Sequence, residues 1–263
     1  MRNDLTTFGR LGRWLAGGAS ILLCLVAWEA IAWSGLLPPL LWPSLEAVAR
    51  ELWKMVLNGD LLYHGGITLK RALVGFAGAI VAGVLMGTLL GTSRLVRRLI
   101  EPVFIFGYPI PKISLYPVFI FVFGFGDWSK IVLVFLECLY PITLQTLAGL
   151  RNTDRVLVWA AQNAGASRTD IFWKVLVPSA APSIFAGIRI ALPVSLIVAI
   201  ITEIIGESRG LGYVVSFASA SFEPARAMAA FAVIAIIGFA FDRGLSAVRA
   251  KVLFWERSDA RLA

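Results

Sequence analysis

Few residues in this sequence have types and spacings that could support chemistry, and they are dispersed along the chain. Among 263 residues there is one histidine, His64, and there are two cysteines, which lie in apolar runs without C-x-x-C spacing. The carboxylates Glu29, Glu137 and Glu203 interrupt apolar stretches but are far apart in sequence. Metal sites and acid–base pairs need convergent groups. The sequence therefore predicts no metal site, no directly bound cofactor and no catalytic residue.

Nucleotide hydrolysis by this chain is also excluded. A phosphate-binding loop of the Walker type requires Gly-Lys followed by Ser or Thr, because backbone donors and one lysine hold the phosphates. None of the six lysines follows a glycine: Lys54, Lys70, Lys112, Lys130, Lys174 and Lys251. If ATP drives this protein, we expect it to be hydrolysed on a separate chain.

One lysine lies within an apolar run. Lys112 lies in the stretch from about Leu99 to Phe123, which also contains Pro102, Pro109, Pro111 and Pro117. Prolines are tolerated in membrane helices where neighbours or water satisfy the freed carbonyls, and intramembrane charges usually face the interior. We expect Lys112 to lie on a translocation pathway, with snorkelling or a structural ion pair as an equal alternative.

The composition indicates what kind of protein positions these residues. Hydrophobic residues make up 59% of the chain, charged residues 15%, and the mean hydropathy is +0.81, whereas soluble domains carry about 25% charged residues. The net charge of +8 does not indicate nucleic acid, because the charges flank apolar runs. The sequence predicts an all-α polytopic membrane bundle with about six spans, near residues 19–37, 67–92, 99–123, 129–150, 184–205 and 226–248.

The basic residues predict the orientation of these spans. Six spans place both termini on one side, and that side carries fifteen Lys and Arg in its loops against five on the other. Positive loops are retained in the cytoplasm. We therefore expect both termini and the central loop to be cytoplasmic. The basic start, Met1–Arg13, could belong to a signal peptide, but the following run is long and lacks an A-x-A site, so it is interpreted as a retained first span.

Three shorter features supplement the spans. Residues 43–57 have an apolar stripe after Ser44, a plausible N-cap, and are predicted to lie at the periplasmic membrane surface. Gly83, Gly87 and Gly91 form a small-xxx-small series that lets another helix approach closely. Residues 206–224 are polar and glycine-containing, and are predicted to form a loop.

The central stretch, residues 152–187, is too often interrupted by charges to cross a membrane. Its pattern predicts two short helices, with a break or a close backbone approach at Gly165. Ser167 and Asp170 form a Ser-x-x-Asp capping pattern. Pro178 and Pro182 are predicted to end the second helix. The result would be a half-apolar protrusion suited to docking.

These residues resemble a known family. Ala160-Ala161, Gly165-Ala166-Ser167 and the segment from Leu176 to Pro182 resemble the EAA loop of permease subunits of ATP-binding-cassette (ABC) importers. Further segments are similar to the branch that takes up sulfonates, taurine, nitrate and thiamine precursors. They are Trp42-Pro43-Ser44, Ile110-Pro111-Lys112, Phe123–Gly126 with Ser129-Lys130, Thr202-Glu203 and Gly210–Tyr213. The sequence departs from the family at Trp159, where the glutamate that names the loop is expected.

The resemblance implies a fold, a location and partners. Residues 1–263 would form a single permease domain of the type I importer kind in the bacterial inner membrane, with a cytoplasmic coupling loop at 151–183. A homodimer would assemble with two ATPase subunits, which bind the ATP, and with an extracytoplasmic substrate-binding protein. The residues expected to couple to the ATPase are Ala160, Ala161, Gly165, Ala166, Ser167, Phe172, Val175 and Pro178.

The pathway and substrate are less constrained. The third and fifth spans are expected to line the pathway at the dimer axis, with candidate residues Pro109, Pro111, Lys112, Ser114, Ser195, Thr202 and Glu203. Ser and Thr in membrane helices also commonly bond their own backbone. Lys112 would suit a small anion such as a sulfonate or nitrate, and a thiamine-precursor-like pyrimidine is the alternative.

Two other classes of function compete with the importer. A stand-alone secondary transporter usually shows inverted repeats and coupling carboxylates, and no repeat is evident here. The other class is an enzyme or a purely structural subunit. An enzyme would need a catalytic constellation, which the sequence does not show, and the alternatives to an importer leave the central protrusion without a purpose. We therefore favour the importer subunit, which is not itself an enzyme.

Overall fold

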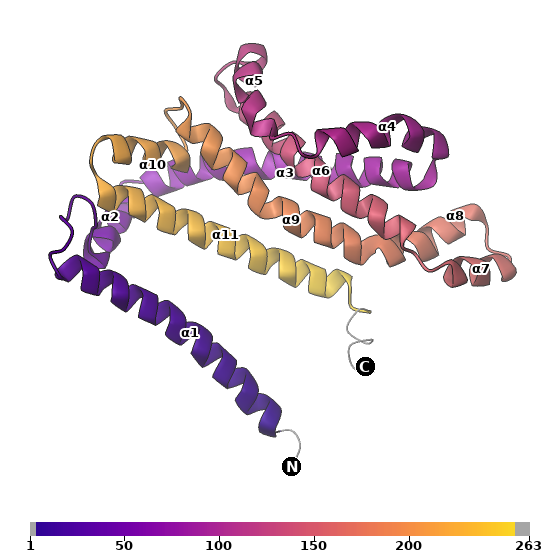
Figure 1. Cartoon of the computed structure of the whole chain (residues 1–263), viewed down its shortest axis with the longest axis horizontal. Coiled ribbons are helices and arrows are strands. Elements are labelled where there is room, and N and C mark those ends of the chain that lie inside the picture. The colour runs from indigo at the N-terminus through magenta and orange to yellow at the C-terminus, as the bar shows by residue number, and fades with distance from the viewer. Residues whose placement is uncertain (1–3, 256–263) are drawn as a thin grey trace. The chain divides into compact units, whose positions relative to one another are not determined.

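The computed structural model describes residues 4–255, with side chains from residue 19 onward, and every regular element in this part of the chain is a helix (Figure 1). The all-helical fold class predicted from the sequence is thereby confirmed. The described residues fall into two compact units, one made of residues 4–62 and 214–233, the other of residues 63–213 and 234–255. The single permease domain stays a prediction.

The larger unit is built around helix α6 (Asp127–Arg151) and helix α9 (Val177–Ile204), which lie side by side (Figure 1). Two glycines permit their close approach. A Cβ atom on Gly149 would lie 2.8 Å from the Cβ of Ser183, and one on Gly187 would lie 2.9 Å from the Cβ of Gln145. Association in lipid depends on such close packing, because lipid tails are as apolar as the side chains.

Helix α3 (Asp60–Thr92) packs against an adjoining face of α6 through the glycine series noted in the sequence. A Cβ atom on Gly83 would lie 2.8 Å from the Ile142 side chain, and one on Gly87 would lie 2.7 Å from the carbonyl oxygen of Thr143. The predicted close approach is confirmed, and α6 is the helix that approaches.

The proline-rich stretch does not form one straight helix. Helix α4 (Arg94–Gly107) is followed by a 3₁₀ turn, η1 (Lys112–Leu115), and by helix α5 (Tyr116–Phe123). The two arms are bent by 89°. Pro109 and Pro111 lie in the break, where neither residue has an N–H to continue a helix. The predicted interruption is confirmed.

Among the described residues, four helical segments are long and apolar enough to cross a membrane: α3, Arg168–Ile204, α6 and α11 (Pro224–Val252), and the bent pair would make a fifth. The predicted first span falls in α1 (Asp4–Trp33), of which Ala19–Trp33 is a shorter apolar helix. The total of six spans stays a prediction.

The predicted loop at residues 206–224 is wrong in part, because helix α10 (Leu211–Ala220) lies within it. Leu211, Val214, Val215 and Ala218 are all buried. Their spacing of i, i+3, i+4 and i+7 is that of one helical face. Burial of this face favours a helix over a loop despite the surrounding glycines and serines.

The smaller unit joins α1 to α2 (Leu45–Leu57) through paired tryptophans. The Trp28 and Trp42 rings lie 4.1 Å apart. The Trp28 indole N–H donates to the Pro43 carbonyl, and the Trp42 indole N–H donates to the Trp28 carbonyl within α1. Ser44 caps α2 as predicted, accepting from the Ala47 N–H. Glu29 adds a second acceptor at this helix start, bonding the Leu45 N–H at 2.8 Å.

The glycine contacts predict a difference between two substitutions in the same helix. We expect Gly87→Ala to lower the free energy of unfolding by about 1–3 kcal/mol, because the added methyl group meets the backbone of α6. Gly66→Ala is the matched control, since a Cβ there meets nothing within 4 Å. Thermal unfolding of the purified chain in detergent measures both variants. Equal shifts in their unfolding temperatures would contradict the close packing of α3 on α6 at Gly87.

Candidate functional site

The central protrusion is a helical hairpin, here called the 155–176 hairpin. Helix α7 (Arg155–Asn163) leads into helix α8 (Arg168–Ile171), which continues into a π-helical turn, η2 (Phe172–Leu176). Asp154 starts α7 by accepting from the Val156 N–H at 2.8 Å. The predicted pair of short helices is therefore present.

The turn of the hairpin is fixed by local hydrogen bonds. Gly165 has φ +77°, the left-handed conformation that glycine adopts at low cost. The Gly165 N–H donates to the Gln162 carbonyl and the Ala166 N–H to the Ala161 carbonyl, which together form a Schellman motif. The sequence predicted either a break or a close backbone approach at Gly165. The structure shows a break, because nothing lies within 4 Å of a Cβ built on this glycine.

The second arm of the hairpin is capped as predicted. The Ser167 hydroxyl oxygen accepts from the Asp170 N–H at 3.1 Å, and its own O–H donates to the Asp170 carboxylate. Lys174 pairs with the same carboxylate at 2.6 Å. The cap and the turn are thus satisfied by hydrogen bonds within the hairpin itself.

One sequence prediction about this arm is wrong. Pro178 and Pro182 do not end the helix, which runs on through α9 to Ile204. The π-helical turn η2 ends at Leu176, so Pro178 falls in the first turn of α9, where a missing N–H is tolerated. The hairpin is consequently continuous with a membrane-length helix.

The eight residues predicted to couple to the ATPase differ in their exposure to solvent. Ala160, Gly165 and Ser167 are exposed, and the other five are half-buried: Ala161, Ala166, Phe172, Val175 and Pro178. Sequence reasoning missed larger apolar side chains on the same hairpin. Trp159 is 57% exposed and Trp173 63% exposed, and both Val156 and Leu157 are exposed. The sequence could have indicated these residues, because large apolar side chains are unusual on a polar protrusion.

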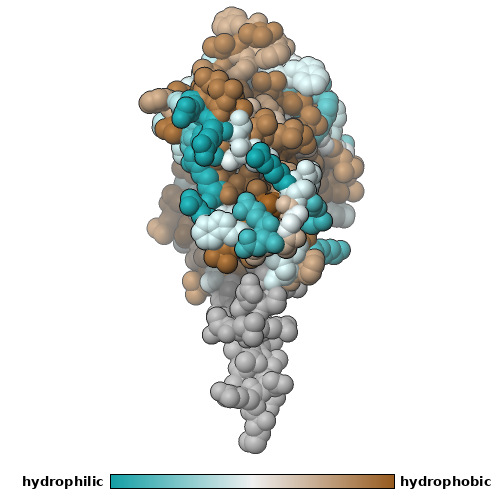
Figure 2. Space-filling model, turned by 90° about the vertical axis from the view of Figure 1, so that its right-hand side faces the viewer, coloured by the Kyte–Doolittle hydropathy of each residue, from teal (hydrophilic) through white to brown (hydrophobic). Residues whose placement is uncertain are grey.

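The hairpin end of the molecule is polar around these residues. Figure 2 shows hydrophilic side chains gathered on the face that carries α7 and α8, bordered by hydrophobic ones. Exposed polar residues here include Arg155, Gln162, Asn163, Arg168 and Lys174. A face of this kind suits a water-exposed protein partner better than lipid.

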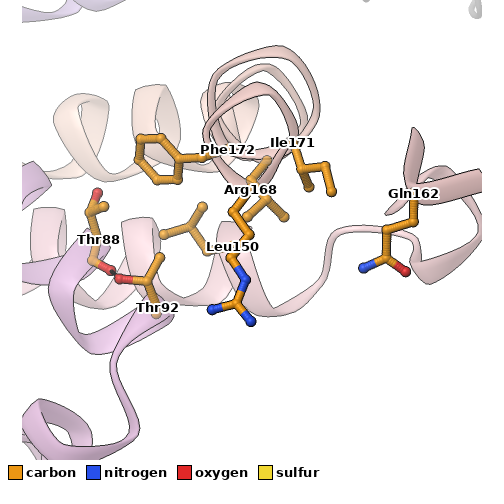
Figure 3. A pocket seen from close by; sticks show the side chains of 9 residues that line it. Thr88, Thr92, Leu150, Gln162, Arg168, Ile171 and Phe172 are labelled. Carbon is orange, nitrogen blue, oxygen red and sulfur yellow. Dashed lines mark hydrogen bonds between the residues drawn. The ribbon is translucent and has the colours of Figure 1, made fainter. Parts of the chain in front are cut away.

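A cavity of about 610 Å³ lies beside the hairpin (Figure 3). Thr88, Gly91 and Thr92 line it from the end of α3, and Leu150 lines it from α6. The hairpin contributes Gln162, Arg168, Ile171, Phe172 and Leu176. The cavity thus lies between the second arm of the hairpin and the ends of α3 and α6.

The predicted pathway residues fall into two places. Pro109, Pro111 and Ser114 are exposed at the break between α4 and α5, whereas Lys112 in the same break is buried. Ser195, Thr202 and Glu203 lie on α9 and are fully buried. The Ser195 and Thr202 hydroxyls donate to the carbonyls of Leu192 and Ala199, which is the alternative role weighed for them.

Glu203 belongs to a buried ionic cluster that sequence reasoning did not find. Its carboxylate accepts from Arg71 at 3.0 Å, from the Thr68 hydroxyl at 2.8 Å and from the Gly212 N–H at 3.0 Å. Arg71 is fully buried and also pairs with Asp127 at 2.8 Å. The cluster ties α3, α6 and α9 to the segment that starts α10.

Further charges complete this cluster. Lys130 pairs with Glu207 at 2.6 Å, and Lys70 pairs with Asp127 at 2.8 Å. Three bases therefore meet three acids, and the buried charges are compensated as desolvation requires. Arg71 and Glu203 are separated by 132 positions in the chain, so no local sequence pattern could have paired them.

Substitutions of the neighbouring bases Arg71 and Lys70 are expected to have unequal effects on stability. Removing the fully buried Arg71 leaves the buried Glu203 carboxylate without its cationic partner, so Arg71→Met should cost about 3–5 kcal/mol of unfolding free energy. Lys70 pairs with the same Asp127 but is 61% exposed, and Lys70→Met should cost less than about 1 kcal/mol. Detergent unfolding curves measure both. Similar losses of unfolding free energy in the two variants would show that burial does not determine how much each ion pair contributes to stability.

Comparison with known proteins identifies related chains. A family model described as "Binding-protein-dependent transport system inner membrane component" matches residues 79–250. The taurine transport system permease protein TauC of Escherichia coli is 31% identical over 241 residues, covering 90% of this chain and 88% of that protein. The formylaminopyrimidine transport permease protein ThiX of Halalkalibacterium halodurans is 30% identical, covering 90% and 94%.

Solved structures show the same fold. An inward-facing MetNI methionine ABC transporter matches with a TM-score of 0.56 and 21% identity, covering 78% of this chain and 98% of that chain. An amino acid ABC transporter crystallised with histidines matches with a TM-score of 0.60 and 16% identity, covering 77% and 97%.

Proposed function

This chain belongs to the binding-protein-dependent transport system inner membrane components, and from that premise we propose that its 155–176 hairpin is the part on which a separate ATPase subunit acts. The family resemblance predicted from the sequence is confirmed. The chain is a multi-pass membrane permease subunit of an ABC importer and is not itself an enzyme. Its family implies an ATPase and a binding protein as partners.

The observation that carries the proposal is the combination of exposure and continuity in the hairpin. Trp159 and Trp173 are more than half exposed on an element whose turn and second arm are capped by its own residues. A partner that covers these side chains gains their burial, at about 25 cal/mol per Å² of apolar surface. Because the hairpin continues into α9 without a break, a force on it reaches a membrane-length helix.

Trp159 fits this proposal although it replaces the glutamate of the family pattern. A glutamate would offer a charge to the ATPase, whereas the exposed indole offers apolar area and one N–H donor. We propose that the contact at this position is apolar. The small residues Ala160, Ala161, Gly165, Ala166 and Ser167 would then let the partner approach the hairpin backbone, and Phe172, Val175 and Pro178 would support it from beneath.

The assembly and orientation complete the proposal. Two copies of this chain would form the pathway, with Pro109, Pro111 and Ser114 exposed toward it and with Ser195, Thr202 and Glu203 supporting it from α9. ATP would be bound by the two ATPase subunits. The excess of Lys and Arg in the loops on the hairpin side supports a cytoplasmic hairpin and cytoplasmic termini.

We propose a small anion of the sulfonate, taurine or nitrate kind as the substrate. The similarity to a taurine permease of Escherichia coli supports this class, and the equally similar ThiX, named for formylaminopyrimidine, supports a pyrimidine as the second candidate. Uptake of a labelled aminosulfonate and of a labelled formylaminopyrimidine, each measured in cells that express the complete importer, separates the two. Uptake of the pyrimidine alone would overturn the anion.

Substitution at the hairpin turn tests the coupling role. We expect Gly165→Asp to abolish co-purification of the ATPase and transport while leaving membrane insertion intact, because it places a charged side chain on the docking surface. Gly35→Asp is the matched control, since Gly35 also has positive φ, +71° against +77°, and also has nothing within 4 Å of its built Cβ. It should retain the ATPase.

The measurement is a pull-down of the tagged chain from mild-detergent extract with quantification of the ATPase. Retention of the ATPase by Gly165→Asp at the level of Gly35→Asp would remove the hairpin from the ATPase interface. Loss in both variants would show that the strain at a positive-φ position, rather than its location, is responsible.

A further inference from the structure

Lys112 occupies an enclosed position in the break between α4 and α5. Only 7% of its surface is exposed, although its neighbours Pro111 and Ser114 are exposed. The ammonium group donates to the Tyr108 carbonyl at 3.1 Å. This bond spans the break, because Tyr108 ends α4 and Lys112 begins η1.

Two aromatic rings enclose the same ammonium group. The Lys112 Nζ lies 4.0 Å from the centre of the Tyr140 ring and 5.8 Å from that of Tyr108. Both distances are within the range of cation–π attraction, which strengthens when the cation is removed from water. Gly107 makes the approach possible, because a Cβ there would lie 3.1 Å from two carbons of the Tyr140 ring.

Glu137 connects the break to α6 from the same side. It lies one helical turn before Tyr140, and its carboxylate accepts from the Ile113 N–H at 3.1 Å. Tyr108, Lys112, Glu137 and Tyr140, here called the Lys112 cluster, thus join both arms of the bend to helix α6.

We propose that Lys112 is a positioning residue of the translocation pathway, which holds the 89° bend against α6, and not a ligand for an anionic substrate. The proposal rests on the assignment of the exposed break to the pathway. The ammonium group of Lys112 is already directed to a carbonyl and two rings, and an anion would have to displace these contacts. Anion preference, if present, would then come from other groups.

Uptake kinetics test this proposal against the ligand role. We expect Lys112→Met and Tyr140→Leu to lower the maximal uptake rate by a similar factor, about ten-fold for one desolvated cation–π contact, without raising KM. The double variant should be no worse than either single variant. Tyr140→Phe keeps the ring and should retain uptake, which distinguishes the cation–π contact from the hydroxyl.

A ligand role predicts a different pattern. Lys112→Met would then raise KM for the anion, and Tyr140→Leu, which leaves the lysine in place, would not reproduce its effect. Either observation overturns the positioning role. ATPase co-purification is measured on the same variants, because its loss would indicate failure of the assembly and not of the bend.

A second readout follows the bend without any substrate. Ser114→Cys, in a chain whose own cysteines are replaced (Cys24→Ser and Cys138→Ala), reports the exposed edge of the break through its rate of thiol labelling. We expect Lys112→Met and Tyr140→Leu to change that rate by roughly ten-fold and Tyr140→Phe to leave it unchanged. Equal labelling rates in all variants would show that the Lys112 cluster does not hold the bend.

Discussion

Close backbone approach to helix α6 is the constraint on which the larger unit depends. Lipid supplies no hydrophobic force between helices, so their association rests on van der Waals packing and polar contacts. Glycines of α3 meet one face of α6, and Gly149 and Gly187 bring α9 against an adjoining face. Glu137 and Tyr140 of α6 then receive the bent segment. A side chain larger than hydrogen at these glycines would separate the helices and loosen the contacts between them.

This arrangement places α9 between two functional ends. At its start it is continuous with the 155–176 hairpin, and at its end Glu203 is held by Arg71, Thr68 and the Gly212 N–H. A hairpin displaced by the ATPase would act on a helix that is firmly fixed at the far end. At the near end the hairpin borders a cavity instead. In our account, α9 transmits a movement of the hairpin toward its fixed end.

Sequence reasoning succeeded where structure is determined by near neighbours. The caps at Ser44 and Ser167, the break at Gly165 and the interruption near Pro109 and Pro111 each follow from residues within a few positions. It failed where distant contacts decide. The helix at α10 depends on burial of Leu211 and its partners, and the pairing of Arg71 with Glu203 depends on the fold of three helices. The enclosure of Lys112 needed Tyr140, which lies on another helix and carries no signal of that role.

The central claim is that the 155–176 hairpin is the seat of the ATPase subunit. Its most direct test is photo-crosslinking in native membranes, with a photoreactive amino acid at position 159 or 173, followed by identification of the linked protein. The account predicts crosslinks from both positions to the ATPase subunit, because both tryptophans are exposed on the hairpin. Crosslinks that form only to this chain or to lipid would contradict it.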